Sequence, residues 1–254
     1  MVTVCLNASD TIQHTLKSVA KQQDVEVEHI VIDGGSIDGT VEILNSAETS
    51  VSHLVSESDD GIYDAMNKGL RLATGDVVGL LNADDVFAHD RVLTQVQLAL
   101  QPENVDGCYA DLVYVDRKSG DDLLRYWRSN EYDKGSARYG WMPPHPTIYL
   151  KKSSLGRIGR YRTDIGPQAD LEFCARLFEK HELVMHYVPD VWVRMRAGGV
   201  TNRQVSDILR GNWKSYVALR ELGIASNPVC FFFRKFLYRV HTYLDIKSAK
   251  LPGS

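Results

Sequence analysis

This chain of 254 residues has few cysteines and no excess of one charge. Its cysteines at positions 5, 108, 174 and 230 lack the paired spacing of a zinc site or a disulfide framework, and we expect them to be buried thiols of a reducing compartment. A net charge of −4 gives no polyanion-binding signature, which disfavours nucleic acid as a partner. The sequence also lacks a basic segment followed by an apolar stretch at its start, and it lacks an uncharged run long enough to cross a bilayer. These absences predict a cytoplasmic protein without a signal peptide or a membrane-spanning helix.

Short apolar segments alternate with helical patterns in the first half of the chain. With 44% hydrophobic residues the chain can bury a full core, and this alternation predicts an α/β fold with a largely parallel sheet flanked by helices. The expected strands are 2–6, 27–32, 51–55, 77–81 and 106–115, and the expected helices lie at about 12–20, 41–45, 62–72 and 92–100.

The pattern changes after Asp116. Residues 117–147 are polar and aromatic with several prolines, and we expect them to form an irregular wall of a cleft. The remaining pattern predicts a helix over 170–180, two strands over 184–188 and 191–193, and a long helix over 206–222 that ends at Gly223.

Acidic residues follow several of the expected strands. The strand at 77–81 ends in the adjacent pair Asp84–Asp85, and neighbouring carboxylates repel unless a cation or a donor-rich ligand lies between them. Hard oxygen ligands of this kind suit Mg²⁺ or Mn²⁺ holding a diphosphate, although solvated turn residues are the alternative. Asp33 and Asp59–Asp60 follow two other expected strands, and parallel strands would bring all three acidic groups to one edge of the sheet.

Four segments resemble a known family in their sequence and in their order. Val2–Asn7, Asp33–Thr40 (DGGSIDGT), Glu57–Gly69 (ESDDGIYDAMNKG) and Leu81–Asp85 (LNADD) are similar to glycosyltransferase family 2, and within it to bacterial enzymes of surface-polysaccharide and O-antigen synthesis. The resemblance runs through roughly the first 200 residues, and GIYDAMNKG and LNADD are its most specific parts. It implies a GT-A fold, which is a Rossmann-like, mostly parallel sheet flanked by helices. It also implies a nucleotide-diphosphate sugar donor, Mn²⁺ or Mg²⁺ as cofactor, and inversion at the anomeric carbon.

The resemblance also implies roles for individual residues on the donor side. Lys68 has a physical case as a diphosphate partner, although a solvated helix lysine is equally consistent with the sequence. By position, Asn7 and Asp33 would lie near the base, Asp59, Asp64 and Lys68 would belong to the helix-start segment of the donor site, Asp84 would approach the ribose, and Asp85 would ligate the metal.

The catalytic base is expected in a different segment. Asp170 starts a predicted helix and matches the family's base position, and its alternative role is to cap that helix or to interact with the helix dipole. The family often has an acidic pair here, but Ala169 leaves a single acid at this point, so Glu172 is a weaker candidate. His145 lies among prolines and matches a histidine segment that precedes the acceptor loop; it is either a positioned acceptor-side residue or part of the loop packing.

Two further segments have open interpretations. Arg194 and Arg196 belong to a sequence that resembles a glycine-pair loop of the family, where either arginine could bind diphosphate or simply lie on the surface. The aromatic and basic tail 228–247 suits a helix on an anionic membrane leaflet, near a lipid-linked acceptor, or a core helix or dimer contact. The Gln-x-x-Arg-Trp sequence of processive relatives is absent, which favours single addition.

The sequence therefore predicts an inverting, non-processive glycosyltransferase that moves a sugar, from a UDP-sugar in preference, to a hydroxyl of a lipid-linked saccharide in cell-surface polysaccharide synthesis. Residues 1–116 would form the nucleotide-sugar-binding half, 117–204 the acceptor-side half of the same catalytic domain, and 205–254 a helical region with a membrane-surface contact. A sugar nucleotidyltransferase is one alternative, although no early glycine-rich basic loop is present. An inactive sugar-nucleotide-binding partner protein is the other, and a homo-oligomer is compatible with each.

Overall fold

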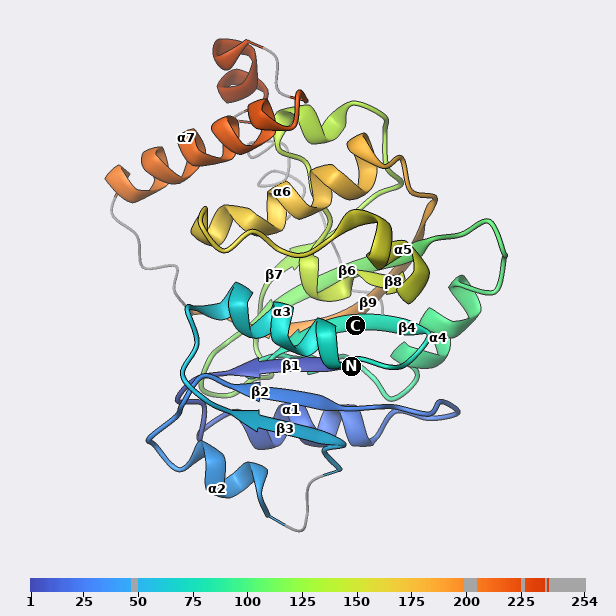
Figure 1. The fold of residues 1–254 in the computed structure, drawn as a ribbon, viewed down its shortest axis with the longest axis vertical. Helices are drawn as coiled ribbons and strands as arrows, with labels where there is room; N and C mark the ends of the chain where they lie inside the picture. Colours follow the sequence, from blue (N-terminus) through green and yellow to red (C-terminus); the bar gives the residue numbers. More distant parts are fainter. Residues whose placement is uncertain (47–49, 199–204, 225–226, 236, 238–254) are drawn as a thin grey trace.

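A nine-stranded sheet runs through the centre of the computed structural model, with helices on both of its faces (Figure 1). The structure describes residues 1–46, 50–198, 205–224, 227–235 and 237. Along the main path the strands follow the order β3-β2-β1-β4-β8-β6-β9-β5, and β7 pairs with β6 outside this path. The predicted α/β class is confirmed.

The first four strands are parallel and are joined by helices, as their alternation in the sequence predicts. Each helix buries an apolar side against the sheet, and the predicted ranges agree with the observed ones to within a few residues. The elements are β1 (Val2–Cys5), α1 (Ile12–Ala20), β2 (Ile30–Asp33), α2 (Thr40–Leu44), β3 (His53–Ser56), α3 (Ile62–Leu72) and β4 (Val77–Asn82).

The second half of the sheet mixes both strand directions. β8 lies antiparallel between β4 and β6, β9 is parallel to β6, and β5 is antiparallel to β9 at the edge. The elements are β5 (Val86–Phe87), α4 (Val92–Ala99), β6 (Gly107–Val115), β7 (Leu123–Trp127), β8 (Tyr149–Lys151), α5 (Lys152–Ile158), α6 (Ala169–Ala175, continued by a π-helical turn, Arg176–Lys180), β9 (Met185–Arg196) and α7 (Val205–Glu221).

Two hydrophobic layers cover the sheet. One contains side chains of α3 and α6, and the other contains side chains of α1 and α4. Close packing of α3 on β1 depends on Gly69, because a Cβ atom there would come within 2.2 Å of a Val2 side-chain atom. The helix that carries the GIYDAMNKG segment is therefore fixed directly against the central strand.

Two predictions about the second half are wrong, and two elements there were not predicted. Residues 117–147 contain β7, whose first three residues are exposed and whose apolar residues do not alternate, so its sequence lacks the pattern of a strand. The two strands expected near 184–193 are one strand, β9, in which a bulge in the pairing with β6 accommodates Pro189. Residues 149–158, for which no element was expected, form β8 and α5.

The C-terminal region packs on α6 through a small aromatic cluster. α7 ends before Gly223, which has a φ of +75°, as predicted for a helix stop. Phe231, in a helical segment over 228–235, is fully buried against Tyr216 and Leu219 of α7. The rest of the predicted surface helix, 238–247, lies outside the described residues.

The cysteines are free, and three of them are buried as expected, at positions 5, 108 and 174. Cys230 is exposed, which corrects the expectation that all four are core thiols, because it lies on the outer side of the helical segment whose Phe231 faces inward. Among the described residues, no helix is both long and apolar enough to span a bilayer.

Candidate functional site

The carboxyl ends of β1, β2, β3 and β4 lie at one edge of the sheet, because these strands are parallel. Asn7 follows β1, Asp33 ends β2, Asp59 follows β3 and Asp84 follows β4. The loops after β2 and β3 are in contact, since a Cβ atom on Gly34 would lie 2.6 Å from Oδ2 of Asp59. The acids that follow separate strands therefore reach the same edge.

Asp33 is fully buried and accepts several hydrogen bonds. Its carboxylate accepts from the backbone amides of Gly35 (3.1 Å) and Ser36 (3.0 Å) and from the hydroxyls of Ser36 and Ser56, the latter at 2.7 Å. Burial raises the pKa of this carboxyl, but the hydrogen bonds outweigh burial, and the pKa falls below its usual range. A nucleotide base that reaches Asp33 would have to displace a serine hydroxyl.

Asn7 connects the loop after β1 to the same turn. Its φ of +49° lies in the left-handed region, which asparagine tolerates better than most residues. Its backbone N–H donates to Oγ of Ser36 (2.7 Å), and its Oδ1 accepts from the N–H of Ile37 (3.0 Å). The side chain of Ile37 is almost fully exposed, so this turn presents an apolar surface at the edge where Asn7 and Asp33 meet.

Lys68 lies on α3 and is held by oxygen atoms on two sides. Its Nζ lies 2.8 Å from Oε1 of Glu57 and 3.3 Å from Oδ2 of Asp64. The hydrogen bond with Glu57 raises the pKa of Lys68, so the lysine is charged. Because Glu57 is much more exposed than Lys68, a diphosphate could take its place beside the ammonium.

The acidic pair after β4 has one buried and one partly exposed member. Asp85 is fully buried, and burial together with the charge of Asp84 raises its pKa well above the usual range. Nδ2 of Asn82 donates to Oδ2 of Asp85 (3.1 Å), whereas Oδ1 has no hydrogen-bond partner among the described residues. The hydroxyl of Thr15 holds the turn by donating to the carbonyl oxygen of Asp85 (2.7 Å).

This pair fits a divalent cation in part. Burial raises the pKa of Asp84, while the charges of Arg117 and Arg196 lower it. Two adjacent carboxyl groups, with an unpartnered oxygen on Asp85, offer the hard ligands that Mg²⁺ and Mn²⁺ accept. Within the described ranges, no group of three or more His, Cys, Asp or Glu side chains is placed to hold a metal. The pair therefore fits a cation whose other oxygen ligands come from a diphosphate or water.

Asp170 lies in the first turn of α6, opposite His145 in a 3₁₀ turn before β8. Nδ1 of His145 is 3.6 Å from Oδ2 of Asp170, and each side chain is 17% exposed. Oδ1 of Asp170 is buried and has no hydrogen-bond partner in the described part of the chain. The N-cap of α6 is Gln168, so the alternative role of Asp170 as a helix cap has no support. A positioned carboxylate with an open oxygen is suited to accept a proton.

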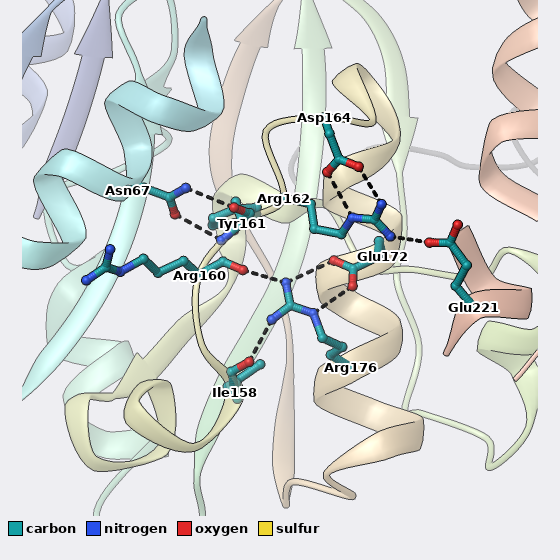
Figure 2. Close-up of polar contacts among 9 residues, drawn as sticks. All are labelled: Asn67, Ile158, Arg160, Tyr161, Arg162, Asp164, Glu172, Arg176 and Glu221. Atoms are coloured by element: carbon teal, nitrogen blue, oxygen red, sulfur yellow. Dashed lines mark hydrogen bonds and ion pairs between the residues drawn. The ribbon is translucent and has the colours of Figure 1, made fainter. Parts of the chain in front are cut away.

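Glu172, the weaker candidate for the base, is engaged in a buried ion pair (Figure 2). Nε and Nη2 of Arg176 donate to its two carboxylate oxygens at 2.8 and 2.9 Å. The same guanidinium donates to the carbonyl oxygens of Ile158 and Arg160, both at 2.6 Å. Both carboxylate oxygens of Glu172 are therefore bound, and Arg176 joins this carboxylate to the end of α5 and to the segment that follows it.

The comparison with known families decides the identity. The sequence matches Glycosyl transferase family 2 over residues 1–159. The chain belongs to this family. An uncharacterized glycosyltransferase of Mycobacterium tuberculosis is 35% identical over 182 residues, which cover 69% of this chain and 67% of that protein. A PGL/p-HBAD biosynthesis glycosyltransferase of Mycobacterium bovis is 29% identical over 204 residues, or 78% of this chain and 76% of the relative.

Solved structures share the GT-A fold of this glycosyltransferase. S. aureus TarS 1-349 in complex with UDP-GlcNAc has a TM-score of 0.68 at 16% sequence identity. The aligned part covers 93% of this chain and 72% of the TarS 1-349 chain. The mannosyltransferase PcManGT from Pyrobaculum calidifontis, in complex with GDP-Man and Mn2+, has a TM-score of 0.64 at 20% sequence identity. The aligned part covers 96% of this chain and 69% of the PcManGT chain. The longer S. aureus TarS chain is covered over only 38% of its length.

A bridge between the donor edge and α6 was missed by sequence reasoning in this glycosyltransferase. Asn67 of the GIYDAMNKG segment donates from Nδ2 to the carbonyl oxygen of Tyr161 (2.8 Å) and accepts from its N–H (2.9 Å; Figure 2). The ring of Tyr161 stacks on Phe173 of α6, with centroids 4.0 Å apart, and on Tyr63 of α3. Asn67 therefore couples α3 to the helix that carries Asp170. The feature of the sequence that could have indicated this role is an asparagine within the apolar face of a predicted helix.

Arg194 and Arg196 lie in β9, so the expectation that they belong to a loop is corrected. β9 extends to Arg196 because it stays paired with β6 as far as Val115. Arg194 donates to the carbonyl oxygen of Gly120 (2.8 Å), and Arg196 donates to that of Arg117 (2.8 Å). Both arginines support the loop between β6 and β7. Gly199 of the same segment lies outside the described residues.

Proposed function

We propose that this glycosyltransferase moves a sugar from a nucleotide-diphosphate donor to an acceptor hydroxyl with inversion, with Asp170 as the catalytic base. One observation supports this assignment most strongly. Asp170 keeps a buried oxygen without a partner in the described part of the chain, and it lies on a different element from the acidic pair Asp84–Asp85. An acid that serves the acceptor and a separate acidic pair that serves the donor are what a single displacement requires.

The donor would bind along the carboxyl edge of β1–β4. Asn7 and Asp33 would contact the base, Asp84 the ribose, and Lys68 the diphosphate after Glu57 moves away. Related folds support this class of donor, because solved neighbours contain UDP-GlcNAc and GDP-Man. We propose a UDP-sugar as the donor, and a screen of donors with different nucleotide bases tests this choice.

A divalent metal would be held by the acidic pair, with Asp85 as the predicted ligand. Neighbours of this fold contain Mn2+ with GDP-Man or Mg2+ with UDP. When bound, such a cation neutralises charge on the leaving diphosphate. Because Asp85 is fully buried and Asp84 is partly exposed, Asp84 offers the carboxylate that a ligand reaches first. Both residues therefore belong in the test.

At the acceptor, Asp170 would take the proton of the attacking hydroxyl through its open oxygen. His145 would position the carboxylate through its contact with the other oxygen. Attack and departure occur in one displacement, which inverts the anomeric carbon and needs no covalent nucleophile. Glu172 is excluded from this role in the proposal because Arg176 binds both of its oxygens.

The acceptor that we propose is a lipid-linked saccharide of cell-surface polysaccharide synthesis, with one sugar added per binding event. A relative is named as a PGL/p-HBAD biosynthesis glycosyltransferase. Val229, Phe233 and Leu237 recur every fourth residue and are exposed, so the C-terminal segment presents an apolar stripe to its surroundings. We propose that this stripe touches the inner face of the membrane.

The test is a donor-hydrolysis screen across UDP-, GDP- and dTDP-sugars, with Mn²⁺ and with EDTA, for the wild type and for Asp84→Asn and Asp85→Asn. We expect one donor class to be hydrolysed, metal to be required, and both variants to lose most of this activity. Undiminished wild-type activity in EDTA would remove the metal role. Loss in Asp84→Asn alone would move the metal contact from Asp85 to Asp84. Hydrolysis of no nucleotide sugar, with nucleotide binding retained, would favour an inactive binding protein.

A further inference from the structure

A second charged hollow, here called the cationic groove, lies at the far edge of the sheet. Its walls are the polar face of α1 on one side and the 119–121 loop with the end of β9 on the other, and its floor is the edge strand β5 with residues 88–90. The hollow measures about 560 Å³. Its lining includes Arg194 and Arg196, which were expected either to bind diphosphate or to lie on the surface, and none of the other predicted donor or base residues Asn7, Asp33, Asp59, Asp64, Lys68, Asp84, Asp85 and Asp170.

Four permanent cations from two separate elements line the cationic groove. Lys17 comes from α1, Lys21 is the C-cap residue of this helix, and Arg194 and Arg196 come from β9. Ser18 of α1 also lines the groove, but its hydroxyl donates to the carbonyl oxygen of Thr15 (2.8 Å). These groups surround the same volume, although they are far apart in the sequence.

The acids near the groove offset the charge of the two arginines but form no ion pair with the two lysines among the described residues; the charge of Arg196 acts on Asp84. Asp121 forms an ion pair with Arg194 (3.0 Å) and is largely exposed. The other acid of the lining, Asp90, accepts a hydrogen bond from the side-chain amide of Gln23 (2.8 Å). Among the residues that the structure describes, no acid forms an ion pair with Lys17 or Lys21.

Such an arrangement is unfavourable without a counterion. Lys17 and Lys21 are four residues apart on one helix, where like charges repel. Arg194 and Arg196 are two residues apart on a strand, so their side chains leave the same face of β9 and add to the field. The last turn of α1 stabilises a cation such as Lys17 through the helix dipole, but this effect does not account for arginines on the opposite wall. A concave surface of one sign concentrates an anion between its walls.

We propose that the cationic groove binds a phosphate-bearing ligand at a site separate from the sugar donor. Phosphate oxygens accept charge-assisted hydrogen bonds from ammonium and guanidinium groups at once. The phosphate can belong to a membrane lipid headgroup or to a free phosphate compound, and both have the same recognition chemistry. This inference goes beyond the proposed function, because Lys17 and Lys21 belong to neither the donor site nor the base site; Arg196 lines the groove and also lies near the donor site, since its charge acts on Asp84.

The first measurement is calorimetric titration of the full chain with inorganic pyrophosphate in EDTA. The test variant is Lys17→Gln/Lys21→Gln, and the control is Lys134→Gln/Lys180→Gln, which removes two exposed lysines elsewhere and changes the net charge equally. We expect the control to bind pyrophosphate like the wild type. The affinity of the test variant should fall by about tenfold or more, because two charge-assisted contacts are lost. Raising the salt concentration should weaken wild-type binding.

The second measurement separates the sources of phosphate. Flotation on phosphatidylglycerol vesicles, with phosphatidylcholine vesicles for comparison, reports headgroup binding, and pyrophosphate titration reports free phosphate. If the test variant floats less than the control and the wild type does not bind pyrophosphate, the groove is assigned to a lipid headgroup. If the test variant binds pyrophosphate more weakly than the control and both float equally, the groove is assigned to a free phosphate compound. If the test and control variants behave alike in both assays, the proposal is overturned. Donor hydrolysis, measured in parallel, should be unchanged in both variants and reports on the proposed function independently.

Discussion

Hydrogen bonds divide the carboxylates of this chain into those that hold the fold and those that stay open to a ligand. Asp33 and Glu172 are buried and have hydrogen-bond donors on both oxygens. Asp85 and Asp170 each keep one buried oxygen without a partner in the described residues. An unpaired buried oxygen is costly in the free protein, so it marks a place where a ligand or a proton is expected.

At the residue scale, Asp170→Asn tests the base. The amide keeps the size of the side chain but cannot accept the proton, so we expect turnover to fall about 10²–10⁴-fold with unchanged nucleotide affinity. The measurement is steady-state transfer together with nucleotide binding by calorimetry. Asp164→Asn, which alters an exposed acid paired with Arg162, is the matched control and should transfer normally. Normal turnover in Asp170→Asn would assign the base to another residue.

A second residue-scale prediction concerns Asp33 and pH. Its folded-state pKa lies below the unfolded value, so ionised Asp33 stabilises the fold above about pH 4, and this contribution is lost as the pH falls through the lower folded value. We expect Asp33→Asn to cost about 1.5–3 kcal/mol at pH 7, since hydrogen bonds to a charged group are lost. Urea unfolding across pH measures it: the difference from the wild type should shrink in acid. A difference that does not change with pH would contradict the assignment.

At the element scale, Arg176 determines how α6 meets the rest of the acceptor side. Its guanidinium binds Glu172 within α6 and two carbonyl oxygens of the segment after α5, while Asn67 holds Tyr161 of that segment from α3 (Figure 2). The helix that carries Asp170 is thereby linked to the helix that carries Lys68. Positioning of the base relative to the donor therefore depends on side chains that do not touch either ligand.

The corresponding prediction is a double-mutant cycle of Glu172→Met and Arg176→Met. Removing one partner leaves the other buried without its counter-charge, so each single variant should lose about 3–5 kcal/mol. The double variant should lose clearly less than the sum of the two, because no unpaired charge remains. Chemical denaturation of all four proteins measures the coupling energy. Additive losses would show that the pair does not act as a unit.

At the scale of the whole molecule, the C-terminal segment has one side toward the protein and one side away from it. Phe231 is fully buried against α7, whereas Phe233 is 62% exposed in the stripe with Val229 and Leu237. The two phenylalanines are two residues apart on one helical segment, so they form a matched pair for separating a core role from a surface role.

We expect Phe231→Ala to cost about 3–5 kcal/mol of stability, as a large core deletion does. Phe233→Ala should change stability by less than about 0.5 kcal/mol, as exposed substitutions do. In the proposal of a membrane contact, Phe233→Ala instead lowers flotation on anionic vesicles. Thermal unfolding and flotation of both variants measure the two effects. Equal flotation of Phe233→Ala and wild type would remove the stripe from the membrane contact.

Local sequence patterns determined most of the secondary structure in the first half of this chain. Alternating apolar segments specify β1–β4 and their crossover helices, because each strand is an apolar run and each helix has the spacing that buries one face. The place of the acids after these strands follows from the parallel direction alone. Asp170 at the start of a helix was likewise readable from its neighbours. In each case, the information lies within a few residues along the chain.

Only the tertiary structure decided what each polar side chain does. The sequence treats Glu172 and Asp170 as similar acids two residues apart. In the structure, Arg176, one helical turn after Glu172, binds both oxygens of Glu172 and the carbonyl oxygens of Ile158 and Arg160, whereas one oxygen of Asp170 has no partner in the described residues. β7 and the continuity of β9 through its bulge likewise depend on pairing with β6, since an exposed or a bulged strand lacks a regular alternation of apolar residues. The cationic groove joins α1 to β9 across most of the chain. Apart from Arg176, which lies four residues from Glu172, the partners that decide these roles come from other elements of the fold, because hydrogen bonds and charges act through space.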